Sequence, residues 1–159
     1  MRTSGYGLTV DEVERVPLDE NAAARQRLTT LIDSLGDDDL GRPVTPSWSV
    51  ATVLAQVAFW DRWAQILVKR WRSGQLPPPT VPPWYDDAIN HTLLPTWQAL
   101  PGREAANLAL SAAEAADHEI EKAETPVLAG ILASRQSNLL DRATPRNDAL
   151  DRIEHALRA

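Results

Sequence analysis

The sequence predicts an all-α protein: a bundle of four main helices with one long connection and short accessory helices. Three observations predict this class. Apolar residues recur at the i, i+3, i+4 spacing of amphipathic helices along most of the chain. The β-branched residues are too dispersed to form alternating strands. Gly is scarce, with 7 residues, whereas Pro is common, with 12, which is typical of helices joined by proline-containing loops.

The elements follow from the positions of caps, glycines and prolines. Residues 1–18 are expected to form an irregular lead-in with a helical turn at 10–16. The first main helix is predicted over 20–35, where the apolar residues form a single stripe. The second is predicted from an N-cap at Ser49 to about residue 73. It is apolar around most of its circumference, so we expect it to lie at the centre of the bundle.

Proline dominates the middle of the chain. Five prolines within 77–83 exclude a helix and predict a stiff, extended crossover. A short helix is expected over 84–99, interrupted near Pro95. Small residues along one face of the third main helix, 103–123, suggest close helix packing. Another helical segment is expected over 127–142, followed by a loop. The last helix is then expected to begin with Thr144 as N-cap and Pro145 at its first position, and to end at Leu157.

Length and charge limit the classes of function. With 159 residues, the chain is expected to be a single domain over 1–159. A net charge of −6 argues against nucleic acid and anionic membranes as partners. No apolar run approaches the roughly 20 residues of a membrane-spanning helix, and the first residues lack the apolar core of a secretory signal. We therefore expect a cytoplasmic protein. The absence of Cys excludes disulfides, thiolate metal ligands and Cys nucleophiles.

The second main helix carries two polar residues within its apolar arc. Gln56 lies beside Trp60 and Trp63, and a buried amide must find hydrogen-bond partners. Two interpretations stay open: Gln56 bonds to a neighbouring helix or a trapped water, or it lines a polar pocket. Asp61 lies at the edge of the same arc, where an ion pair with an Arg is favoured over a catalytic acid. The tryptophans are expected to be core residues first. The candidate pocket residues are Trp48, Trp60, Asp61, Trp63, Trp84 and Asn90.

The last helix offers further polar side chains. Asn147 and Asp151 have i, i+4 spacing and can point at one site. Asp151 and His155 share that spacing and could form a weak metal clip, although a divalent site needs three or more ligands. His118 is expected on a solvated acidic face, and His91 has no clear role. The sequence contains no dinucleotide-binding, P-loop, nucleophile-elbow or zincin motif.

A family resemblance rests on the second helix. The run from Trp48 to Asp61, WSVATVLAQVAFWD, resembles the DinB-like superfamily, and within it the mycothiol-dependent maleylpyruvate isomerase N-terminal domains. Those proteins read W-[ST]-V and then L-A-H-[LV]-A-x-W-[DE]. The resemblance implies a four-helix bundle of up-down-down-up type with a long crossover. It also implies a divalent metal, such as zinc or nickel, held by one His of the second helix and an H-x-x-x-H pair of the last.

By position, the three metal ligands of that family fall on Gln56, Asn147 and Asp151 of this chain. Amide oxygens are weak neutral ligands, and only Asp151 carries charge, so such a site would lose most of its affinity for zinc or nickel. The resemblance therefore implies a degenerate metal site. We expect no cofactor, with zinc or nickel as the less favoured alternative.

A second resemblance concerns Ala143–Asn147, which is similar to the A-[ST]-P-x-[KR]-N run of the colibactin self-protection proteins. These belong to the same superfamily and hydrolyse a strained ring without the histidine triad.

The sequence leads to three hypotheses about function. The favoured one is a protein that binds small molecules, or acts in stress, through a pocket between the second and last helices. The second is an enzyme, either a metal-dependent thiol transferase or isomerase or a metal-free hydrolase. The third is a non-catalytic homodimer that acts through protein interactions.

Overall fold

The computed structural model describes residues 10–75 and 82–159. Residues 1–9 of the predicted lead-in and most of the predicted crossover lie outside this part of the chain. The described residues are helical except for loops and one small hairpin, which confirms the all-α class. Within them, no helix combines the length and the apolar character needed to cross a bilayer.

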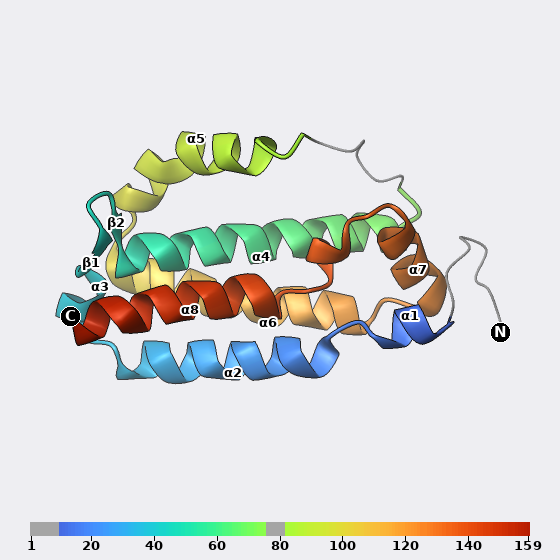
Figure 1. Cartoon of the computed structure of the whole chain (residues 1–159), viewed down its shortest axis with the longest axis horizontal. Helices are drawn as coiled ribbons and strands as arrows, with labels where there is room; N and C mark the ends of the chain where they lie inside the picture. Colours follow the sequence, from blue (N-terminus) through green and yellow to red (C-terminus); the bar gives the residue numbers. More distant parts are fainter. Residues whose placement is uncertain (1–9, 76–81) are drawn as a thin grey trace.

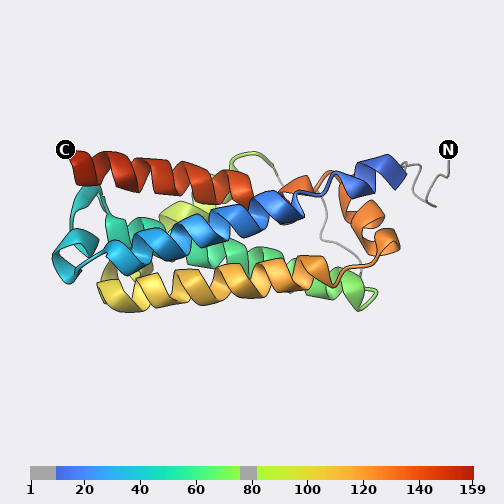
Figure 2. The same ribbon diagram turned by 90° about the horizontal axis from the view of Figure 1, so that it is seen from below.

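Four long helices lie side by side along the length of the molecule (Figures 1 and 2). They are α2 (Leu18–Ser34), α4 (Val50–Arg72), α6 (Gly102–Glu121) and α8 (Ala143–Arg158). Both α2 and α4 contact α6 and α8, so the four helices form a closed ring around the core. Figure 1 shows that α2 and α8 run in one direction and that α4 and α6 run in the other. Helix α5 (Tyr85–Ala99) lies outside the ring, against α4.

Short elements close the two ends of the ring. Helix α3 (Asp37–Leu40) and the antiparallel strands β1 (Pro43–Thr45) and β2 (Trp48–Ser49) lie at one end. Helices α1 (Val10–Glu14) and α7 (Thr125–Ala133) lie at the other end, with the 3-10 turn η1 (Ser137–Leu139) between α7 and α8. The sequence predicted no strand in the segment that the hairpin occupies. The hairpin is too short to show an alternating sequence pattern.

Helix α4 packs against α6 and α8 within the ring and against α5 on the outside, as its apolar circumference predicts. Ser49 caps it, because its Oγ accepts a hydrogen bond from the Thr52 amide at 3.1 Å. Val53 and Leu54 are fully buried. Helix α6 approaches α4 closely because the face it turns inward is made of alanines. These buried residues are Ala105, Ala106, Ala109, Ala112, Ala113 and Ala116.

Three boundaries differ from those predicted. Helix α5 continues through Pro95, which is exposed, so water can bond the carbonyl that loses its amide partner. The segment predicted as one helix over 127–142 is broken after α7, where Arg135 takes a positive φ of 60°. Helix α8 begins at Ala143 with Arg142 as N-cap, whereas Thr144 was predicted as the cap. Thr144 instead donates a hydrogen bond to Asp141 Oδ2 at 2.8 Å.

Candidate functional site

A cavity of about 210 Å³ lies between α4 and the first half of α8. Helix α4 contributes Gln56, Val57 and Trp60. The N-cap and first three turns of α8 contribute Arg142, Pro145, Arg146, Asp148, Ala149 and Arg152. The inner wall is buried or half-buried, whereas Pro145, Asp148 and Arg152 are exposed and form the rim. Apolar residues and three arginines therefore line one space that opens to the surface.

An ion network lies under the cavity and joins α4 to α8. Asp61 is fully buried, and its two oxygens accept hydrogen bonds from Arg142 Nε and Arg146 Nε, each at 2.8 Å. The side chain of Arg142 is only 7% exposed and that of Arg146 only 1%. The ion pair expected for Asp61 is thus present, and it has two partners. Asp61 supports the cavity from beneath instead of lining it.

Arg146 carries the network across to α6 and α2. Its Nη1 donates to Asp117 Oδ2 at 3.0 Å, and its Nη2 lies 2.8 Å from Asp117 Oδ1 without the angle of a hydrogen bond. The same guanidinium donates to the carbonyls of Asn21 and Ala113. Burial lowers the pKa of Arg146, but the charge of Asp61 and the hydrogen bond with Asp117 outweigh it, so the pKa lies above the ordinary arginine value. Arg146 is permanently charged.

Asn21 of α2 fixes the start of α8 from the opposite side. Its Oδ1 accepts hydrogen bonds from the backbone amides of Arg142 and Ala143, both at 2.9 Å. Its Nδ2 donates to the Leu140 carbonyl at 2.8 Å. One buried side chain therefore satisfies three backbone groups and sets where α8 begins.

The structure brings Gln56 to the cavity. The residue is half-buried, and its amide makes no hydrogen bond to any other described residue. Of the two interpretations of Gln56, this placement favours the lining of a polar pocket. Trp60 forms the neighbouring wall, and its indole Nε1 donates to Asn90 Oδ1 of α5 at 2.9 Å. Asn90 therefore orients Trp60 from behind.

Asn147 and Asp151 do not join Gln56. Both accept hydrogen bonds from Arg27 of α2, Asn147 Oδ1 at 3.1 Å and Asp151 Oδ1 at 2.6 Å, and neither lines the cavity. Glu154 also accepts from Arg27, at 3.0 Å. The hydrogen bond with Asp151 is the main reason that the pKa of Arg27 is raised. The expected convergence of the three positions on one point is therefore not seen.

The residues present do not fit the divalent metal that the family resemblance implies. An arginine side chain has no lone pair to give a metal, and its charge repels a cation. Three arginines line the cavity beside Gln56, and Asn147 Oδ1 and one carboxylate oxygen of Asp151 accept hydrogen bonds from Arg27. Over residues 10–75 and 82–159 there is no group of three or more His, Asp or Glu side chains that could hold a metal ion.

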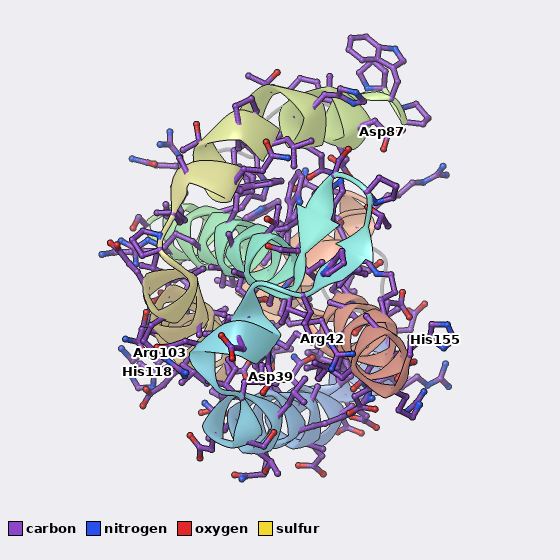
Figure 3. All side chains as sticks on the ribbon, turned by 90° about the vertical axis from the view of Figure 1, so that its left-hand side faces the viewer. Asp39, Arg42, Asp87, Arg103, His118 and His155 are labelled. Carbon is purple, nitrogen blue, oxygen red and sulfur yellow. The ribbon has the colours of Figure 1, made fainter. Side chains whose placement is uncertain are left out.

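The histidines lie apart from the cavity. His91, His118 and His155 are all exposed, and none lines it. Figure 3 shows His118 on the outer side of α6 and His155 on the outer side of α8. Because Asp151 is held by Arg27, the spacing of Asp151 and His155 does not make them a free pair of ligands.

The remaining candidate tryptophans are placed elsewhere. Trp48 packs against the buried Trp97, with ring centroids 5.8 Å apart. Trp63 stacks on Phe59 at 6.2 Å. Trp84 is 64% exposed at the start of α5. Of the four tryptophans proposed for the pocket, only Trp60 lines it.

Sequence reasoning missed the arginines of the site. Arg142 and Arg146 have i, i+4 spacing, and a lone acidic residue in an apolar helix requires such a counterion. Combining these two signals could have paired them with Asp61. Asp148 and Arg152 at the rim carry no such signal, because exposed charges are ordinary on a helix surface.

No family model, no curated protein and no solved structure matches the chain.

Proposed function

We propose that this protein binds a small molecule in the cavity between α4 and α8. The observation that carries the proposal is the amide of Gln56, which lines the cavity and has no hydrogen-bond partner among the described residues. A half-buried amide without a protein partner must bond water or a ligand. An apolar wall with a few unpaired polar groups is the usual composition of a ligand pocket.

The size of the cavity limits the ligand. Its 210 Å³ is below the roughly 300–1,000 Å³ of pockets for drug-sized molecules. The cavity is open on one side, so a ligand smaller than a drug-sized molecule fits, with any larger part extending past the rim.

The wider proposal is that the chain is a DinB-like bundle in which a degenerate metal site has become a binding site. The opposed directions of the helix pairs α2 and α8, and α4 and α6, support it. So does Gln56, which stands in the cavity at the position of the family's helix-two ligand. The homodimer and the enzymatic alternatives stay predictions.

A library of compounds of up to about a dozen non-hydrogen atoms tests the proposal by thermal shift, followed by Trp fluorescence. At least one compound is expected to raise Tm, since a ligand that binds only the folded state stabilises it. The Gln56→Phe variant should abolish that shift by filling the cavity. Gln65→Phe is the matched control, because Gln65 lies on the same helix outside the cavity lining.

Two outcomes would contradict the proposal. One is a library in which no compound stabilises the protein. The other is a compound whose effect survives in Gln56→Phe. Trp60→Phe identifies the reporter, because Trp60 is the only cavity-lining tryptophan among the described residues and a fluorescence response should depend on it.

A further inference from the structure

We infer that the ligand of the α4–α8 cavity is a small organic carboxylate, whose anionic group meets Arg142 and Arg152 and whose apolar body lies against Trp60. This inference rests on the proposed function and names the class of molecule that the site takes. It also replaces the metal cation of the family resemblance by an anion, because the charge of the cavity wall is positive.

Arg142 provides the strongest observation. Its Nε is taken by Asp61 and its Nη1 by the Asn138 carbonyl, each at 2.8 Å. Its Nη2 has no acceptor among the described residues, although the side chain is more than nine-tenths buried and lines the cavity. Nη2 is not among the fully enclosed unpaired atoms of the described residues, so it can still be reached. A carboxylate oxygen is the best acceptor for such a donor.

The balance of charge in the wall points the same way. Arg146 lines the cavity, but each of its three guanidinium nitrogens already donates to a protein acceptor, so its main contribution to the site is its charge. Arg152 stands at the rim without an ion pair to any described residue. Counting the lining together with its buried ion network, four arginines (Arg25, Arg142, Arg146 and Arg152) face three carboxylates (Asp61, Asp117 and Asp148), so one positive charge remains. A field of this sign attracts an anion into a protein whose net charge is −6.

The cavity also offers apolar surface to the body of a ligand. Val57 and Trp60 of α4 and Pro145 and Ala149 of α8 provide it. Because the indole Nε1 of Trp60 already donates to Asn90, the ring offers carbon surface to the cavity. The free amide of Gln56 also lines the cavity and can donate to a second carboxylate oxygen. Inorganic anions would leave the apolar wall uncovered.

Side chains, not the end of helix α8, carry the anion site. The Ala143 amide is bonded to Asn21 and the Thr144 amide to Asp141. Pro145 has no amide hydrogen, and the Arg146 amide bonds within the helix turn. The first-turn donors that could bind an anion are therefore occupied or absent. Substitution of rim side chains can consequently test the inference.

Benzoate, benzamide, acetate and inorganic phosphate are the probes, titrated into the full chain by ligand-observed NMR and calorimetry. Benzoate and benzamide share a shape and differ in charge, so benzoate is expected to bind at least about 10-fold more tightly. Acetate and phosphate should bind more weakly than benzoate because they lack the apolar body. Equal binding of benzoate and benzamide, or tighter binding of phosphate, overturns the inference.

Two exposed rim positions provide variants that leave the buried network intact. Arg152→Gln should weaken benzoate about 3-fold, and Asp148→Asn should strengthen it by a similar factor. The matched controls, Arg158→Gln and Asp33→Asn, make the same changes of charge on exposed residues outside the cavity and should leave the affinity unchanged.

The results separate this inference from the proposed function. One result is a neutral compound that binds in the cavity with an affinity that neither rim variant changes. It would refute the inference that the ligand is a carboxylate, while the proposed function in ligand binding would stand. If no compound of the library or of this set binds, both fail. Rim variants that change benzoate affinity no more than their controls also overturn the inference.

Discussion

Replacing Asp61 by Asn removes the one negative charge shared by Arg142 and Arg146 on α8. Each Asp61 oxygen accepts one charge-assisted hydrogen bond at 2.8 Å, and each such bond contributes about 1.5–3 kcal/mol. Asparagine keeps one oxygen and turns an amino group toward the second guanidinium. Breaking a buried pair from one side costs about 3–5 kcal/mol. We therefore expect the free energy of unfolding to fall by about 4 kcal/mol, about a thousandfold in the equilibrium.

Urea denaturation, followed by far-UV circular dichroism, measures this loss. The midpoint should fall while the slope m stays unchanged, because the surface exposed on unfolding is the same. Asp148→Asn is the matched control: Asp148 is exposed and unpaired with any described residue, so we expect a change within about 0.5 kcal/mol. A loss below about 1 kcal/mol for Asp61→Asn would refute the reasoning.

A double-mutant cycle with Arg142 separates the ion pair from packing. Asp61→Asn and Arg142→Met each leave a buried partner unpaired. The double variant should therefore lose less free energy of unfolding than the sum of the two single losses. The expected coupling is about 1–3 kcal/mol. Simple additivity would mean that the 2.8 Å contact contributes little.

Three further substitutions test other parts of the structure. Gln56→Leu should be neutral or stabilising by up to about 1 kcal/mol, because the amide has no partner among the described residues; a loss above about 2 kcal/mol in urea would contradict this. Gly130→Ala should lower stability by about 1–3 kcal/mol, because a Cβ there would lie 2.7 Å from Trp71 Cζ3; a rise in Tm would show that the ring can move aside. Asn21→Ala should cost about 3 kcal/mol, since three buried backbone groups lose their partner, and the amide of Arg142 should exchange hydrogen faster. Unchanged exchange at that amide would count against the role given to Asn21.

The main helices could be predicted because each buries one face, which places apolar residues at helical spacing in the sequence. The predicted 20–35 and 103–123 helices match α2 and α6 to within two residues at each end. The failures are local. Pro95 does not break α5, because the helix is exposed there. The break at Arg135 depends on a positive φ, and the sequence has no Gly or Asn at that position to indicate it.

The structure places the candidate residues of α4 and those of α8 differently. Gln56 and Trp60 do line a cavity that α8 closes. On α8, the residues at the cavity rim are Asp148 and Arg152, one position beyond Asn147 and Asp151. One position rotates a side chain by about 100° around a helix, enough to turn it from α4 toward α2. The apolar stripe of a helix can be predicted from its sequence. Which neighbouring helix the residues on either side of that stripe contact can be known only from the tertiary structure.

The ion network also has a consequence for synthesis on the ribosome. Asp61 and Asp117 are translated before Arg142 and Arg146, which neutralise them. Until those arginines emerge, packing α4 against α6 would bury two carboxylates, with only the Arg25 contact at 3.5 Å to offset one of them. Completing the core before Arg142 and Arg146 have been synthesised is therefore energetically disfavoured. A chain truncated before Arg142 is expected to be cut by proteases faster than the full chain.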